Sequence, residues 1–328
     1  MIRDVLIVGA GPSGLATAIA AKQAGLDYAL LEKGALVNSI FNFPTHMVFF
    51  TTPELLEIGK LPLVTPYDKP TRLEALRYYR RVVDTYDLSI SFDETVVSIE
   101  REQGNVFAVE TTTSRGARRI RQARAVVLAI GYYDRPNTLG IAGEELPHVS
   151  HYYTDAHPYY RKRVVIVGGK NSAAEAALEL YRAGSMPTIV HRHATLGDSI
   201  KYWVRPDIEN RIKEGTVGVR FESQVLEITP SLVIIEGPGG VREEVPAEAV
   251  FLLTGYLPDV ALMRAAGVNC DAETLSPEHS SETFETNVPN LFVIGGAMAG
   301  RHTGTVFIEN GRFHGEKAIA TLAERLRD

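Results

Sequence analysis

Residues 5–14 read VLIVGAGPSG, and residues 164–173 read VVIVGGKNSA. In each stretch an apolar run, suited to a buried strand, enters a glycine turn, and a run typical of a helix follows. A turn of this design between a strand and a helix holds the pyrophosphate of a dinucleotide. One such turn is a weak signal. Two in one chain predict two dinucleotide sites and indicate electron transfer between them.

Size and composition limit the classes of protein to consider. The chain has 328 residues, of which 45% are hydrophobic and 23% charged, and its formal net charge is −6. This suits a globular protein with two domains and argues against non-specific nucleic-acid binding. The first strand begins at about Ile2, which leaves no room for a signal peptide, and no apolar run is long enough for a membrane span. We expect a cytoplasmic protein without nucleic-acid or membrane partners.

Neither cysteine nor histidine patterns predict a further reactive site. Cys270 is the only cysteine, so the chain has no internal disulfide and no Cys-x-x-Cys redox pair. The ordinary interpretation of a lone cysteine is an inert, partly buried residue. His148, His151 and His157 lie near Asp155 in an expected crossover loop without the spacing of metal ligands. We therefore expect no metal.

The order of strand and helix patterns predicts an α/β fold with two Rossmann-like, three-layer dinucleotide-binding domains. Asp134-Arg135-Pro136 is a plausible crossover into the second domain, and TGYLPD at 254–259 is a plausible return. The first domain is therefore expected to be discontinuous, at residues 1–134 and 252–328. The second domain, residues 135–251, would be inserted into it.

The first turn has the three glycines that a dinucleotide needs. Gly9 would permit the sharp bend, Gly11 would let the backbone approach the pyrophosphate, and Gly14 would let helix and strand pack closely. Glu32 ends the next expected strand, where a carboxylate binds a ribose diol and repels a 2′-phosphate. The alternative for Glu32 is a solvated acid at a strand end. In the ribose role it favours an unphosphorylated adenosine, as in FAD or NAD.

The second turn is followed by bases rather than by an acid. Arg192 stands between His191 and His193 at the end of the corresponding strand. A guanidinium there suits the 2′-phosphate of NADP, and Lys201 and Arg205 could add charge. The alternative is a group of ordinary exposed basic residues.

The turn itself is unusual at its middle position. Lys170 replaces the usual middle glycine, and its side chain would crowd the pyrophosphate unless the ammonium group meets a phosphate. Asn171 and Ser172 would supply further hydrogen-bond donors.

Several other stretches are distinctive: NFPTH at 42–46, GGKNSA at 168–173, IKYW at 200–203, RPDIEN at 205–210 and FIENGRFHG at 307–315. With the two turns, they make the chain resemble the two-domain flavoprotein reductases related to thioredoxin reductase. Over nearly its whole length the chain is similar to the bacillithiol disulfide reductase group of that superfamily. The resemblance implies FAD in the discontinuous domain and NADPH in the inserted one.

The chain also departs from these families. Thioredoxin reductases carry a Cys-x-x-Cys pair in the NADPH domain, and its absence here excludes a dithiol relay. Reductases of the bacillithiol group typically have a cysteine inside the first turn, where this chain has Ser13, which cannot form a mixed disulfide. Related flavoproteins usually end the ribityl motif with Gly-Asp, where this chain has Gly296.

The resemblance also implies where the flavin lies. Asn42 and His46 would border it, and Gly295 and Gly296 would lie along its ribityl chain. A helix from about Phe307 to Arg325 would begin near the flavin pyrimidine edge, with Glu309 and Asn310 either there or simply capping the helix. The expected cofactor contacts are Gly9, Gly11, Pro12, Ser13, Gly14, Glu32, Lys33, Asn42, His46, Val97, Gly131, Gly295, Gly296, Gly168, Gly169, Lys170, Asn171, Ser172, Ala173, His191, Arg192, Lys201 and Gly255. No catalytic residue is assigned.

Together these features predict an FAD-dependent NAD(P)H oxidoreductase that passes electrons from NADPH through FAD to a small acceptor, such as a low-molecular-weight thiol disulfide. The alternatives are a flavin monooxygenase, a ferredoxin or flavodoxin–NADP reductase with a small redox protein as acceptor, and a non-enzymatic redox sensor. The monooxygenase pattern matches only in part, because His148 lies one place late after Gly143. We expect a homo-oligomer, and Trp203 would either pack internally or lie at the subunit interface.

Overall fold

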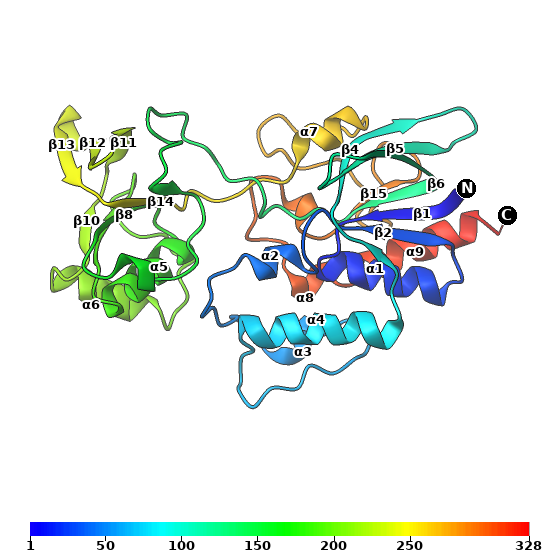
Figure 1. Ribbon diagram of the computed structural model, residues 1–328, viewed down its shortest axis with the longest axis horizontal. Coiled ribbons are helices and arrows are strands. Elements are labelled where there is room, and N and C mark those ends of the chain that lie inside the picture. The colour runs from blue at the N-terminus through cyan, green and yellow to red at the C-terminus, as the bar shows by residue number, and fades with distance from the viewer. Residues whose placement is uncertain (328) are drawn as a thin grey trace. The chain divides into compact units, whose positions relative to one another are not determined.

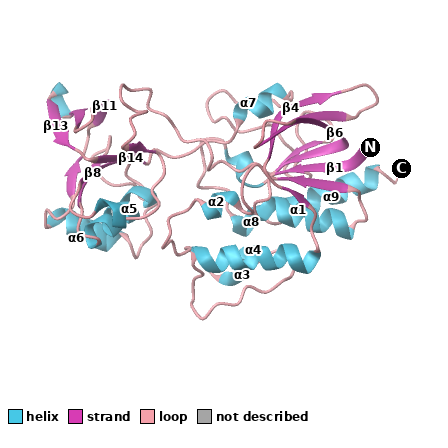
Figure 2. Ribbon diagram, in the orientation of Figure 1, coloured by secondary structure: helices cyan, strands magenta, loops and turns pink. Residues whose placement is uncertain are grey.

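The computed structural model describes residues 1–327, and the chain folds into two compact units. Unit 1 comprises residues 1–43, 47–135 and 256 onward, and unit 2 comprises residues 44–46 and 136–255. Each unit is a layered α/β structure, built on a mixed sheet in unit 1 and on a parallel sheet in unit 2 (Figures 1 and 2). The second unit interrupts the first in sequence, and the predicted fold class is confirmed.

The strands of unit 1 are β1 (Ile2–Val8), β2 (Tyr28–Leu31), β3 (Ile90–Ser91), β4 (Glu94–Arg101), β5 (Phe107–Thr113), β6 (Arg118–Leu128) and β15 (Leu291–Val293). Their order is β3-β2-β1-β6-β5-β4, and β15 pairs with β6. The pairs among β1, β2, β3, β6 and β15 are parallel, whereas β4 and β5 are antiparallel to their neighbours.

Strand β6 belongs to both the parallel and the antiparallel parts of this sheet. Its first half pairs with β5 from Arg118 to Ala123, and its last residues pair with β15 from Val126 to Leu128. The sequence pattern instead predicts two separate strands, at about 118–121 and 125–130. That prediction is wrong, because β1 pairs with β6 from Gln122 to Leu128 and so carries the strand past the point where β5 ends and β15 begins.

Helices and the antiparallel strands cover opposite faces of the parallel part of the unit 1 sheet (Figure 1). One face carries α1 (Pro12–Gln23), α4 (Arg72–Tyr86) and α9 (His314–Arg325), and the other carries β4, β5 and α7 (Val260–Ala265). Val5 and Ile7 of β1 pack into the first core, and Leu6 and Val8 pack into the second. This alternation follows from the two-residue period of a strand. The described part of unit 1 also contains the short α-helices α2 (Asn38–Phe41), α3 (Pro53–Leu56) and α8 (Ile308–Gly311).

The C-terminal helix is broken. The sequence predicts one helix from about Phe307 to Arg325, but the structure has α8 and α9, separated at Arg312 and Phe313. The Arg312 guanidinium donates to the carbonyls of Glu54 and Glu57, at 2.6 and 2.7 Å. This distant anchoring, next to the poor helix former Gly311, explains the interruption.

Unit 2 is built on a five-stranded parallel sheet in the order β10-β9-β8-β14-β7. Helices cover one face of it, and an antiparallel sheet of three strands covers the other, so that apolar side chains form a core on each side. The elements are β7 (Val149–Ser150), β8 (Arg163–Val167), α5 (Asn171–Arg182), β9 (Met186–Val190), α6 (Arg205–Lys213), β10 (Gly218–Arg220), β11 (Gln224–Ile228), β12 (Leu232–Glu236), β13 (Arg242–Pro246) and β14 (Ala249–Leu252).

Candidate cofactor-binding site

The first glycine turn joins β1 to α1, and its glycines have different physical roles. Gly9 has φ +104°, and a Cβ there would lie 2.5 Å from the carbonyl oxygen of Ala129. A Cβ on Gly14 would lie 1.8 Å from the carbonyl oxygen of Gly9. Gly11, by contrast, has no atom within 4 Å of its Cβ position. Packing therefore requires Gly9 and Gly14, whereas Gly11 leaves an open face that a ligand can approach.

The first turn of α1 can accept an anion at this open face. Gly11 is the N-cap in extended conformation, Pro12 follows, and no side chain among residues 1–327 caps the helix. Backbone N–H groups of a first helical turn, with the helix dipole, attract phosphate. The residues present therefore fit the pyrophosphate of a dinucleotide.

Glu32 follows β2 and holds the turn from the side. It is 5% exposed, and its two oxygens accept hydrogen bonds from the backbone N–H groups of Ala10 (2.8 Å) and Gly34 (2.9 Å). Burial raises the pKa of this carboxyl above its usual value, although both N–H bonds lower it. The alternative of a solvated acid is wrong, because Glu32 is buried and bonded to the turn backbone.

The turn after β15 lies directly against α1. Gly295 has φ +60°, and a Cβ there would lie 2.5 Å from Ser13 Oγ. A Cβ on Gly296 would lie 2.8 Å from the ring of Tyr132. The Gly295 N–H donates to His314 Nδ1 at 3.2 Å. The structure thus brings the first glycine turn and the Gly295–Gly296 turn together.

The other residues expected near the flavin have varied surroundings. Asn42 donates from Nδ2 to the carbonyl of Asn38, and Lys33 pairs with Asp134 at 2.8 Å. Val97 is exposed at a register shift of β4, and Gly131 has open space at its Cβ position. His46 groups with unit 2, where its Nε2 lies 3.9 Å from Asp155 Oδ2. These contacts leave the predicted flavin roles open.

The second glycine turn joins β8 to α5 and is packed under a histidine. Gly168 has φ +151°, and a Cβ there would meet the Leu253 carbonyl oxygen at 2.6 Å. A Cβ on Gly169 would lie 2.4 Å from atoms of the His191 imidazole ring. Burial, aided by the neighbouring charges of His193 and Arg192, lowers the pKa of His191. The neutral ring therefore lies on the turn backbone.

Asn171 binds protein rather than offering a free donor. Its Nδ2 donates to the Ser199 carbonyl at 2.8 Å, and its Oδ1 accepts from the Lys201 N–H at 2.9 Å. The Gly197 N–H donates to the Gly169 carbonyl at 2.7 Å. Asn171 and Gly169 thus hold the 197–201 loop beside the N-terminus of α5. The sequence placed Asn171 at this turn but could not show that both ends of its amide bind the loop.

The basic residues near this turn differ in availability. Lys201 Nζ lies 2.6 Å from Glu175 Oε1, and the Lys201 side chain is only 14% exposed. Arg205 donates to the Gly197 carbonyl at 2.6 Å and to Glu209 at 2.9 Å. Arg192 is exposed and donates from Nε to His193 Nε2 at 3.3 Å. Its guanidinium is therefore better placed to meet a phosphate than the two other cations.

The remaining expected contacts lie at the ends of elements. Lys170 is the exposed N-cap of α5, and Ser172 is exposed in its first turn. Ala173 is buried and lies against Gly168. Gly255 has φ +94°, and its carbonyl accepts from the Asn137 N–H at 2.9 Å. Lys170 and Ser172 thus remain available to a ligand.

Cys270 lies in unit 1, at the margin of the core that contains α7. Burial raises the pKa of its thiol, so the reactive thiolate is disfavoured. Among residues 1–327, no group of three or more His, Cys, Asp or Glu side chains is arranged to hold a metal ion. In the same residues, no helix is both long and apolar enough to cross a membrane.

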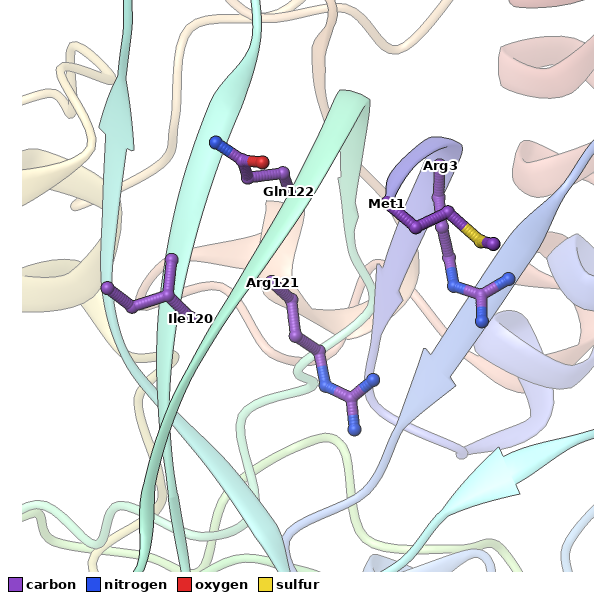
Figure 3. A pocket seen from close by; sticks show the side chains of 5 residues that line it. All are labelled: Met1, Arg3, Ile120, Arg121 and Gln122. Carbon is purple, nitrogen blue, oxygen red and sulfur yellow. The ribbon is translucent and has the colours of Figure 1, made fainter.

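A pocket of about 390 Å³ lies at the start of β1 and along β6 (Figure 3). Met1, Arg3, Ile120, Arg121 and Gln122 line it. Both arginines are paired already, since Arg121 binds the buried carboxylate of Glu94 and Arg3 binds the exposed carboxylate of Asp27. Ligands of parallel α/β sheets bind at the carboxyl ends of strands, and this pocket is at the amino end of β1. We assign it no role in cofactor binding.

Two glycine turns, each after a strand with parallel neighbours, define the class as dinucleotide-dependent oxidoreductases. The sequence matches the family described as pyridine nucleotide-disulphide oxidoreductase over residues 6–295. It is 41% identical over 326 residues to the bacilliredoxin reductase Bdr of Bacillus subtilis (strain 168), with 99% of each chain covered.

Solved structures agree with this match. The bacillithiol disulfide reductase Bdr (YpdA) from Bacillus cereus has a TM-score of 0.96 and 40% identity, over 99% of this chain and 100% of that one. The corresponding structure from Staphylococcus aureus has a TM-score of 0.93 and 36% identity, over 99% of each chain.

The chain belongs to the pyridine nucleotide-disulphide oxidoreductase family. It is an FAD-dependent NAD(P)H oxidoreductase, and its cofactors are FAD and NADPH. The predicted enzyme class, the two cofactors and the resemblance to the bacillithiol group are confirmed.

Two residues that contact the Gly295–Gly296 turn were not singled out from the sequence. His314 accepts the Gly295 N–H, and Tyr132 packs on Gly296. His314 lies inside the distinctive stretch 307–315, which was a usable signal, whereas Tyr132 follows an ordinary strand end.

Proposed function

We propose that this enzyme uses NADPH to reduce a low-molecular-weight disulfide of the bacillithiol type, with FAD at the first glycine turn and NADPH at the second. The carrying observation is the full-length similarity to relatives whose names specify bacilliredoxin and bacillithiol disulfide. In the balanced reaction, NADPH, a proton and the disulfide give NADP⁺ and two thiols. FAD, when bound, supplies the two-electron carrier between NADPH and the acceptor.

The residues of the chain would bind and orient the two nucleotides. The free N–H groups that begin α1 would hold the FAD pyrophosphate, and Glu32 keeps that turn in shape. At the second turn, Lys170 and Ser172 would contact the NADPH pyrophosphate, and Arg192 would bind the 2′-phosphate.

The distribution of thiols supports reduction without a covalent link between chain and substrate. Ser13 occupies the first turn of α1, and Cys270 is the only cysteine. The Cys270 thiol has a raised pKa, so it is a poor nucleophile. Both sulfurs of the substrate would therefore leave as thiols without a mixed disulfide on this protein.

The test is anaerobic oxidation of NADPH by the purified FAD-loaded enzyme. Bacillithiol disulfide, glutathione disulfide, cystine and ferredoxin would be compared as acceptors. Turnover with bacillithiol disulfide well above the other acceptors is the expected result. Turnover with ferredoxin alone, or NADPH oxidation only when oxygen is admitted, would overturn the assignment. Homo-oligomer formation stays a prediction, which light scattering of the same sample checks.

A further inference from the structure

The backbone N–H of Gly295 finds its acceptor outside the sheet. The preceding residue, Ile294, donates to the Leu128 carbonyl at 3.0 Å, in the manner of the strand. Gly295 is buried, and its N–H donates to Nδ1 of His314 at 3.2 Å. A buried N–H without an acceptor is destabilising, so this bond matters for where the chain turns.

The His314 ring is held by stacking. Its centroid lies 4.2 Å from that of Phe284, with an angle of 19° between the planes. Phe284 also stacks with His279, at 6.4 Å and 18°. Lys317 Nζ lies 5.7 Å from the centroid of the Phe284 ring. This row of rings keeps Nδ1 of His314 aimed at Gly295.

The hydrogen bond requires a neutral imidazole with its proton on Nε2, because a protonated Nδ1 cannot accept. Burial lowers the pKa of His314 to about 4, and the charges of Lys317 and His279 act in the same direction. The ring is therefore neutral, and its acceptor is available, across the ordinary pH range.

The bond fixes a turn that has little room to move. Gly295 has φ +60°, and even a Cβ at this position would lie 2.5 Å from Ser13 Oγ in the first turn of α1. Gly311 is also close, since a Cβ there would be 3.2 Å from the same oxygen and 3.3 Å from Gly295 Cα. Displacement of Gly295 would therefore alter the space beside the first glycine turn.

We propose that His314 is a positioning residue for FAD, which holds the Gly295–Gly296 turn against the start of α1 through the Gly295 N–H. This inference rests on the proposed placement of FAD at the first glycine turn. His314 would touch the backbone and not the cofactor, so its effect is on how tightly FAD is held.

Two substitutions at this position separate the acceptor from the stacked ring. Asparagine can place its Oδ1 where Nδ1 was, and so retains the hydrogen-bond acceptor without the ring. Phenylalanine retains the ring that stacks on Phe284 but has no acceptor atom. We expect His314→Phe to weaken FAD binding to the apoprotein about tenfold or more, and His314→Asn to weaken it about threefold at most. His279→Phe, at the far end of the row of rings, is the matched control and should bind FAD as the wild type does.

The measurements are titration of apoprotein with FAD, far-UV circular dichroism and thermal unfolding. Equal FAD affinity in His314→Phe and wild type, or equal loss in the Phe and Asn variants, would overturn the proposal. If His314→Phe does not fold, the pH dependence decides between the outcomes. FAD affinity of the wild type should fall as the pH approaches about 4, and it should fall less in His314→Asn. The same dependence in both would refute the role.

A separate variant tests the placement of FAD. Gly11→Val puts a side chain into the open face of the first turn. Unchanged FAD affinity in Gly11→Val would refute the placement. Loss of affinity there, with none in His314→Phe, would refute only the role of His314. The proposed disulfide substrate is tested separately, by the turnover of the wild type, and neither FAD titration affects that result.

Discussion

Replacement of Glu32 by alanine should destabilise unit 1, because it removes the acceptor of two backbone N–H groups at once. The N–H groups of Ala10 and Gly34 lie 2.8 and 2.9 Å from the carboxylate oxygens, and the side chain is almost fully buried. Each N–H left without a partner costs about 1–3 kcal/mol.

The net effect is smaller than the sum of the two bonds. Burial of the Glu32 carboxylate costs desolvation free energy, which also raises its pKa. The alanine variant no longer carries this cost. We therefore expect the free energy of unfolding to fall by about 2–4 kcal/mol in Glu32→Ala and by about 1–2 kcal/mol in Glu32→Gln, which keeps one acceptor.

Urea unfolding of FAD-free protein measures this change. Far-UV circular dichroism follows both units, whereas the only tryptophan, Trp203, lies in unit 2 and reports that unit by fluorescence. In Glu32→Ala, the unfolding transition of unit 1, seen by dichroism but not by Trp203 fluorescence, should shift to lower urea concentration. Lys33→Ala is the control, because its half-exposed ion pair with Asp134 contributes about 0.5 kcal/mol or less. If Glu32→Ala were no more destabilising than Lys33→Ala, the argument that Glu32 holds the turn would fail.

The other expected outcomes concern cofactor choice, pH and the thiol. Arg192→Ala should raise the KM for NADPH about tenfold or more and leave that for NADH nearly unchanged, and an equal rise for both would contradict a 2′-phosphate contact. Lys201→Ala should change the KM for NADPH by about threefold at most, because Glu175 already neutralises the ammonium. A change as large as that in Arg192→Ala would show that Lys201 also binds NADPH. The folded-state pKa of His314, about 4, lies below its usual 6.5, so its contribution to stability is present above pH 6.5 and is lost as the pH falls toward 4. Unfolding free energies across this interval should fall more steeply in the wild type than in His314→Asn, and parallel curves would exclude the linkage. Cys270→Ser should keep full disulfide turnover. A variant without turnover would show that the Cys270 thiol takes part in the reaction.

Both glycine turns could be predicted from the sequence because their signals are local. A strand that ends at Val8, just before Gly9, and a helix that begins at Pro12 need no distant partner to be recognised. The same holds at Gly168, where the strand, turn and helix follow one another within a few residues. Steric constraint ties each glycine to its position, since a Cβ on Gly9, Gly14 or Gly168 would meet backbone at less than 3 Å.

Side-chain assignments at these turns were less certain, because a hydrogen bond depends on what the fold brings near. The sequence placed Glu32 beside a nucleotide, but only the structure shows that its carboxylate already binds the N–H groups of Ala10 and Gly34. Lys201 was expected to add positive charge, and its proximity to Glu175 depends on how the 197–201 loop folds back over α5.

The sequence by itself therefore determined the fold class and the two nucleotide turns, which follow from chain-local rules of strand, glycine and helix. Tertiary structure decided which residues support those turns. β6 runs unbroken because β1 pairs with it across the point where β5 ends and β15 begins. The last helix breaks where Arg312 reaches distant carbonyls, and His314, stacked on Phe284, accepts the Gly295 N–H. Such contacts join residues far apart in the chain, and no hydrophobic periodicity or spacing encodes them.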